Sequence, residues 1–188
     1  MDSERRAPHR ERKVPKPLDK PRLEELALAY VARFATSAAK LERYLRRKLR
    51  ERGWEGENPP DLGALVERYQ GLGYVDDVAY ARSKGGSLLR RGYGPRRVSQ
   101  ALGEAGIAEE IREETRARPA DERHAALALA RRRGFGPFGQ DIPDREKREK
   151  QLAAMLRAGH PLDSARKMVD APDRTAAEEW AAELDDES

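Results

Sequence analysis

A glycine that ends a helical pattern returns at a constant interval, and this feature constrains the fold more than any other. An interval of 53 residues separates Gly53, Gly106 and Gly159. Four positions before each glycine stands a residue of the type found in cores: Leu49, Leu102 and Met155. Directly after each glycine stands a side chain able to pack over the helix end: Trp54, Ile107 and His160. A fixed period of this length predicts a tandem array whose units bury apolar faces partly against one another.

Apolar residues between these glycines recur at every third or fourth position, as on one face of a helix. Side chains suited to cap helix N-termini stand at Thr36 or Ser37, Asp61, Asp76 and Asp144. Pro95 follows a glycine and suits the first position of a helix. Runs of alternating apolar and polar residues, which would indicate strands, are absent from the sequence. We therefore expect an all-α fold of three tandem three-helix repeats.

The predicted organisation has five segments: a flexible, disordered basic arm (1–22), three repeats (23–74, 75–119 and 120–172) and an acidic tail (173–188). Hydrophobic residues make up 38% of the chain and charged residues another 38%. The mean hydropathy of −0.93 is low for a protein with one large core. A chain this polar is either partly disordered or built from small units, and the regular helical spacing favours small units.

Charge is distributed unevenly around a formal net value of +4. The arm holds eight basic and four acidic side chains, whereas the tail holds one basic and seven acidic. A basic body suggests a nucleic acid or an acidic protein as partner, with the tail able to mask the basic face. The same Lys and Arg residues would also keep a thin protein soluble, so charge alone leaves both interpretations open.

Several function classes are not supported by the sequence. The chain has no cysteine, which excludes disulfides and thiolate zinc sites. No secretory signal begins the chain, and no apolar run approaches the roughly 20 residues of a membrane span, so we expect a cytoplasmic protein. The three histidines lie far apart, and Asp76 with Asp77 is better explained as a helix cap followed by a first-turn acid. We predict no catalytic residue, no cofactor, no metal and no small-molecule substrate.

Clusters of basic residues remain as candidates for contacts with a partner protein or DNA. The second helix of the first repeat offers Arg43, Arg46, Arg47 and Arg50. In the second repeat, a tight turn before a helix N-terminus carries Arg90, Arg91, Tyr93, Arg96 and Arg97. Backbone N–H groups and guanidinium groups at such a turn suit phosphate or carboxylate. The third repeat offers Lys147 and Arg148. The alternative for any single cluster is a solvated helix face.

An ordered series of motifs resembles the RecX family of regulatory proteins. Residues 72–81 read LGYVDDVAYA, residues 90–98 read RRGYGPRRV, and residues 102–107 read LGEAGI. These stretches are similar to the central motif of that family. Residues 40–54 also resemble a segment of the family, whereas LRAGH at 156–160 stands where many members have Arg-Gly-Phe. The resemblance covers about residues 23–170 and leaves both ends of the chain outside.

Resemblance to RecX implies an elongated, curved array of three-helix repeats without catalytic activity. It also implies binding along the groove of the RecA nucleoprotein filament, in contact with RecA and with the phosphate backbone of single- or double-stranded DNA. Such binding limits filament growth, ATP hydrolysis, strand exchange and co-protease action, and so regulates DNA repair, recombination and the SOS response. We expect a monomer. The alternatives are a stand-alone helical DNA-binding protein that does not act on RecA, and a helical scaffold without DNA contacts.

Overall fold

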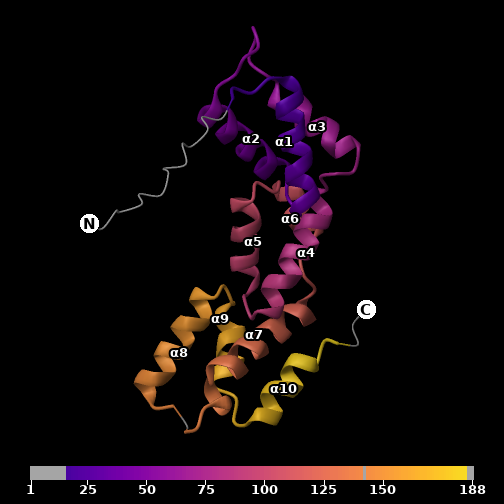
Figure 1. Cartoon of the computed structure of the whole chain (residues 1–188). Coiled ribbons are helices and arrows are strands. Elements are labelled where there is room, and N and C mark those ends of the chain that lie inside the picture. Colours follow the sequence, from indigo (N-terminus) through magenta and orange to yellow (C-terminus); the bar gives the residue numbers. More distant parts are fainter. Residues whose placement is uncertain (1–15, 142, 186–188) are drawn as a thin grey trace, which may run out of the picture.

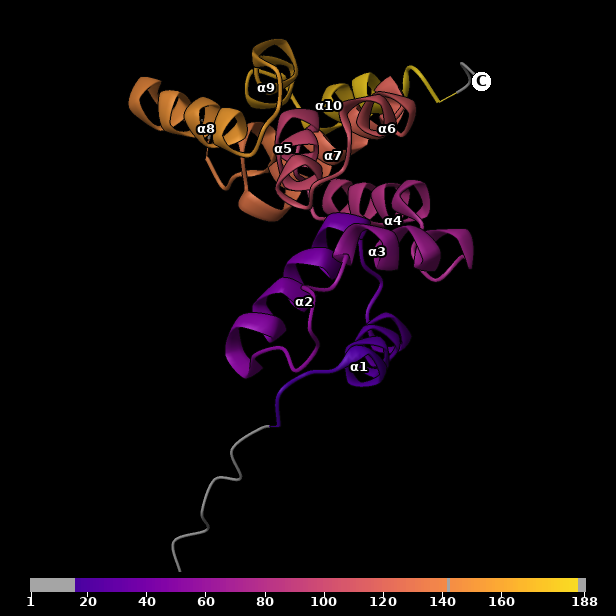
Figure 2. The same cartoon turned by 90° about the horizontal axis from the view of Figure 1, so that it is seen from above.

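The computed structural model describes residues 16–141 and 143–185, which form ten α-helices and one short 3₁₀ helix. Within this part of the chain no β-strand is present beyond one isolated bridge between Leu18 and Trp54. The helices form three groups that follow one another along an elongated molecule (Figure 1). Seen from above, the first group is offset to one side of the other two (Figure 2). The predicted all-α array of three-helix repeats is confirmed, and the third repeat carries a fourth α-helix in addition.

The first repeat consists of α1 (Lys20–Arg33), α2 (Ala38–Arg52) and α3 (Leu62–Gly71). Its core is built from the apolar faces of all three helices and includes Leu23, Leu41, Leu45, Leu65 and Tyr69. The predicted N-caps are confirmed here, because Ser37 and Asp61 accept hydrogen bonds from the N–H groups of Lys40 and Ala64. Such caps satisfy backbone donors that the first helical turn leaves unpaired.

The second repeat consists of α4 (Asp77–Arg90), α5 (Pro95–Glu104) and α6 (Glu109–Glu114). Asp76 caps α4, and Pro95 occupies the first position of α5, as predicted. The buried core of this repeat is small and is formed by Tyr80, Ala81, Leu102, Ala105 and Ile107. So small a core needs support from both neighbouring repeats.

The third repeat consists of α7 (Pro119–Arg133), the 3₁₀ helix η1 (Gly136–Phe138), α8 (Arg145–Arg157), α9 (Leu162–Val169) and α10 (Arg174–Ala182). Asp144 caps α8, as predicted. The expectation that residues 173–188 form a tail outside the repeats is wrong for α10, which buries Ala177 and Ala181 in the core of this repeat. Alanines four positions apart form a narrow apolar stripe, so this helix packs closely despite its acidic composition.

The end of the predicted basic arm is also part of the fold. Leu18 is fully buried in the first core, and its backbone exchanges hydrogen bonds with Gly53 and Glu55 (3.0 and 2.8 Å). The chain enters α1 directly afterwards, with Asp19 as the N-cap. The arm therefore does not extend to residue 22 as expected, and its residues 1–15 lie outside the described part of the chain.

Two of the three periodic glycines end their helices in the same way. Gly106 and Gly159 have φ values of 79° and 95°, which favour glycine. The next residue in each case, Ile107 or His160, donates its N–H five residues back, to Leu102 or Met155. This is the Schellman pattern of helix termination. Gly53 also has a positive φ, but it donates to Leu49 and its chain then continues beside Leu18.

Helix ends also join the repeats, because the second helices follow one another head to tail. At the first junction the Ser37 hydroxyl donates to the carbonyl of Ala105 (2.6 Å), so the C-terminus of α5 meets the N-terminus of α2. At the second junction the N–H groups of Gly94 and Arg96 donate to the carbonyls of Ala158 and Gly159 (2.9 and 3.2 Å). The C-terminus of α8 thus meets the N-terminus of α5. Both junctions satisfy carbonyl groups that a helix C-terminus leaves unpaired, and both align the helix dipoles favourably.

Candidate functional site

The head-to-tail arrangement places the basic second helices α2, α5 and α8 along the same side of the molecule (Figure 1). We call the basic side chains of these three helices the cationic edge. Its members, taken from the predicted residues, are Arg43, Arg46, Arg47, Arg50, Arg96, Arg97, Lys147 and Arg148. The structure therefore brings cations from three distant segments of sequence onto one continuous row of helices.

Within α2 two of these cations, and the neighbouring Lys48, have partners inside the same helix. Arg46 pairs with Glu42, and Arg47 and Lys48 share the carboxylate of Glu51 at 3.5 and 2.6 Å. The hydrogen bond from Lys48 holds the pKa of Glu51 below its ordinary value, so this carboxylate stays ionised. Such exposed pairs contribute little stability and exchange readily for another anion.

Two further arginines of α2 differ from this pattern. Arg43 reaches across the first junction and donates to the carbonyl of Glu104 at 3.0 Å, so it helps to join two repeats. Arg50 is exposed and forms no ion pair within the described residues. Arg50 is thus the cation of α2 most available to a partner.

The turn before α5 differs from the prediction in one respect. We expected its backbone N–H groups to be available for an anion, but those of Gly94 and Arg96 are already bonded to the end of α8. An added Cβ at Gly94 would lie 2.4 Å from the carbonyl carbon of Gly159, so no space for an anion remains there. The expected anion site on backbone amides is therefore absent, because a neighbouring repeat supplies the acceptors.

The side chains of the same turn remain accessible. Arg90, Arg91 and Arg96 are exposed and form no ion pair within residues 16–141 and 143–185. The guanidinium of Arg91 lies 5.7 Å from the centroid of the half-buried Tyr93 ring, at cation–π distance. Arg97 is bound more firmly, since it donates to Gln100 at 2.8 Å and lies 4.0 Å from Glu104.

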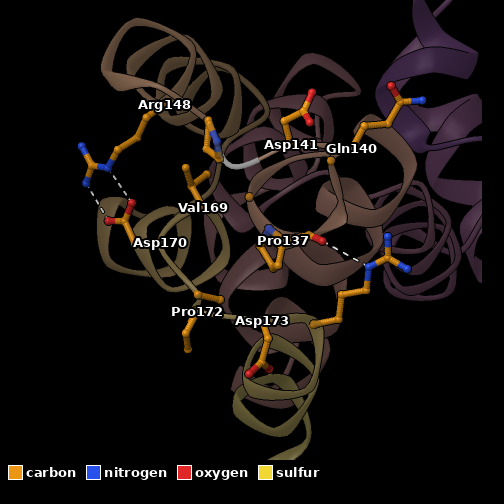
Figure 3. Close-up of a pocket in the computed structure, with 13 residues that line it drawn as sticks. Pro137, Gln140, Asp141, Arg148, Val169, Asp170, Pro172 and Asp173 are labelled. Atoms are coloured by element: carbon orange, nitrogen blue, oxygen red, sulfur yellow. Dashed lines mark hydrogen bonds and ion pairs between the residues drawn. The ribbon is translucent and has the colours of Figure 1, made fainter.

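The two predicted contact residues of α8 also differ in how available they are to a partner. Lys147 is exposed and unpaired among the described residues. Arg148 forms a bidentate pair with Asp170, both N–O distances being 2.6 Å, and the two side chains face each other in Figure 3. The hydrogen bonds to Asp170 raise the pKa of Arg148 above its ordinary value. Arg148 therefore ties α8 to the end of α9 and is less available than Lys147.

A second basic surface lies on α7, and the acidic C-terminal segment covers part of it. Arg123 and Arg131 pair with Glu183 and Glu178, both at 2.6 Å, on or directly after α10. The guanidinium of Arg123 also lies 4.6 Å from the ring centroid of Trp180. The acidic C-terminal segment thus covers cations of α7 rather than those of the cationic edge. Its alanine stripe and Trp180 were the sequence signal for this helix.

Several cavities open on the surface of the described part of the chain. The one in Figure 3 has a volume of about 600 Å³ and lies between η1 and the turn from α9 to α10. Arg148 and Asp170 in its lining pair with each other, and Asp173 and Arg174 bond to the backbone, Arg174 donating to the carbonyl of Pro137 (3.1 Å). Among the described residues no group of three or more potential metal ligands comes together. In the same part of the chain, no helix combines the length and apolarity that a membrane span requires.

Comparison with known proteins agrees with the resemblance noted in the sequence. The family model described as the second three-helix domain of RecX matches residues 76–115, which contain α4, α5 and α6. The crystal structure of RecX from Lactobacillus salivarius shares the fold, with a TM-score of 0.62 at 18% identity over 80% of this chain and 94% of that one.

Similarity in sequence extends over nearly the whole chain. The regulatory protein RecX of Thermus thermophilus is 39% identical over 106 residues, which are 56% of this chain and 70% of that protein. The regulatory protein RecX of Myxococcus xanthus is 32% identical in an alignment of 186 positions, which covers 90% of this chain and 98% of that protein. The chain therefore belongs to the RecX family of regulatory proteins.

Proposed function

We propose that this protein is a non-catalytic regulator that binds the RecA nucleoprotein filament and limits its growth, ATP hydrolysis, recombinase activity and co-protease activity. Membership of the RecX family supplies the regulatory role. The observation that carries the proposal is the cationic edge, whose helices α2, α5 and α8 belong to three repeats and lie along one side of the molecule (Figure 1). A monomer acting in the cytoplasm on DNA repair is part of the same proposal.

The unpaired members of this surface suit a long, negatively charged groove. Arg50, Arg96 and Lys147 belong to different repeats, and each is exposed without an ion pair in the described part of the chain. Cations spaced along a stiff array can meet successive acidic groups or phosphates without ordering a flexible segment. We therefore expect the footprint on the filament to extend over more than one RecA subunit.

Stand-alone DNA binding is the alternative, and the second junction argues against its usual form. In a helix-turn-helix module the N-terminal residues of the second helix contact base edges. In the second repeat these residues belong to α5, whose N-terminus lies against the end of α8. A duplex could not lie against this backbone without separating the repeats, although the exposed side chain of Arg96 stays within reach.

The test follows ATP hydrolysis by RecA on single-stranded DNA while the wild-type protein is added below stoichiometric amounts. We expect hydrolysis to fall; an unchanged rate would contradict the proposal. The variant Arg96→Glu should require a higher concentration for the same inhibition. The matched control is Arg82→Glu on α4, an exposed arginine whose pair with Glu114 (3.1 Å) contributes at most about 1 kcal/mol. This control should inhibit like the wild type.

A further inference from the structure

An aromatic cluster on the first repeat is not explained by core packing alone. The rings of Tyr30 and Tyr44 are stacked between α1 and α2, with centroids 4.2 Å apart and planes inclined by 17°. Phe34 continues this row, its centroid 5.3 Å from that of Tyr30. We call these three residues the aromatic ledge. Phe34 is 52% exposed, so the ledge ends in an open ring.

The backbone holds Phe34 in this exposed position. Its N–H donates to the carbonyl of Tyr30 (3.0 Å) and closes the last turn of α1, while its own φ and ψ are extended. Thr36 and Ser37, which follow, are buried at the first junction. The ring is therefore presented by a segment fixed at both ends. A large aromatic side chain left open on such a segment loses the free energy that its burial would contribute.

Cations surround the aromatic ledge. The guanidinium of Arg33 lies 5.7 Å from the Phe34 centroid. Arg47 and Lys48 lie 5.7 and 5.9 Å from the Tyr44 centroid. Glu51 balances only one of the latter two charges, so the surface around the rings keeps a positive excess. These cations continue into the cationic edge, because Arg47 belongs to both.

We propose that the aromatic ledge stacks an unpaired base of single-stranded DNA on the open ring of Phe34, while the neighbouring cations contact the adjoining phosphates. Flat rings next to cations are the two elements that single-strand binding requires. A duplex does not fit, since its bases are already stacked on one another. The inference rests on the proposed function for its biological setting and extends it by assigning a single strand to one surface of the first repeat.

The test measures binding of fluorescently labelled oligothymidylate to the full chain by anisotropy, without RecA. Loss of a stacked base by Phe34→Ala should weaken binding about 5- to 100-fold. The variant Phe34→Trp should bind at least as tightly as the wild type. Leu28→Ala is the matched control, because Leu28 lies on the same helix, is 47% exposed and has no neighbouring ring in the ledge. It should leave binding unchanged.

A second probe separates the base from the phosphates. An abasic oligonucleotide of the same length carries the same charges without rings, so Phe34→Ala should bind it like the wild type. Equal loss on both probes, or no loss on oligothymidylate, would overturn the proposal. Circular dichroism checks that the variant is folded, which its exposed position leads us to expect.

The outcome is distinguishable from that of the proposed function. If wild-type protein inhibits RecA but Phe34→Ala binds oligothymidylate normally, only the base-stacking proposal is wrong. If inhibition of RecA is lost in Phe34→Ala while oligothymidylate binding is not, the ledge contacts protein, and the base-stacking proposal is again wrong. If single-strand binding depends on Phe34 but RecA is unaffected by the wild type, the regulatory proposal is wrong.

Discussion

Replacing Gly94 by alanine tests the junction between the second and third repeats. The φ of Gly94 is −81°, which any residue adopts, so the substitution introduces no backbone strain of its own. The added Cβ would, however, lie 2.4 to 2.5 Å from three backbone atoms, the carbonyl carbon and oxygen of Gly159 and the nitrogen of His160. These atoms cannot rotate away as a side chain could. The third repeat must therefore move off the N-terminus of α5.

The size of the effect follows from what this movement disrupts. Forcing an extra methyl group into a packed contact costs about 1–3 kcal/mol. The two hydrogen bonds to the end of α8, from Gly94 and Arg96, contribute about 0.5–1.5 kcal/mol each. We therefore expect Gly94→Ala to lower the free energy of unfolding by about 2–6 kcal/mol, a large share of the stability of a small protein.

Gly85→Ala is the matched control, with an effect of opposite sign. Gly85 lies inside α4, and its added Cβ would meet only Val98 Cγ1 at 3.5 Å, an ordinary contact. Alanine is favoured over glycine in a helix by about 1 kcal/mol, so this variant should be more stable than the wild type.

The assay is urea unfolding followed by circular dichroism and by tryptophan fluorescence. The chain has two tryptophans, Trp54 in the first repeat and Trp180 in the third. Weakening a junction of a repeat array uncouples its units, so in Gly94→Ala the two probes should report separate transitions. Equal stabilities of Gly94→Ala and the wild type, with coincident transitions, would refute the close approach described for this junction.

Three further outcomes follow from the structure. Met155→Ala should cost about 2–5 kcal/mol in urea unfolding, whereas Leu49→Ala should cost less, because Met155 is fully buried and Leu49 only partly. Burial lowers the pKa of His160, so the unfolded state binds a proton on this residue more readily than the folded state. Urea unfolding at a series of pH values should therefore show full stability above about pH 6.5, the ordinary pKa of histidine, and a loss of stability below it. The variant His160→Gln should lack this loss. Arg148→Ala should lower the free energy of unfolding by no more than about 1 kcal/mol, because its ion pair with Asp170 is partly exposed. The variant should leave the inhibition of RecA unchanged, because in the wild type the guanidinium is bound to Asp170 and not available to a partner.

Features governed by neighbouring residues could be predicted from the sequence. Ser37, Asp61, Asp76 and Asp144 cap helices as expected, because each cap bonds a backbone N–H only three residues away. The three-helix repeats could be predicted for the same reason, since helical periodicity is also a local signal.

Features that depend on distant segments could not be predicted. The N–H groups of Gly94 and Arg96 looked available for an anion until α8, more than 50 residues later, supplied carbonyl acceptors. Phe34 follows the helical spacing of the buried residues Leu23 and Ala27 of α1, but the helix ends there and the ring is exposed. α10 could not be predicted, because the segment that contains it is acidic and because the alanines that pack it into the core give only a weak apolar signal.

The occupied helix termini determine how the cationic edge can recognise an anion. The N-terminus of α2 is capped by Ser37 and by Asp77, which accepts from the N–H of Ala38 at 2.8 Å. That of α5 bonds to α8, and that of α8 is capped by Asp144. Since the N-terminal amides of each second helix are thus partly occupied, we expect binding to come mainly from guanidinium and ammonium groups. Such binding depends on counterion release, so the affinity for DNA should fall linearly with salt concentration on a log–log scale. Each charge removed from Arg50, Arg96 or Lys147 should then reduce the magnitude of that slope by about one.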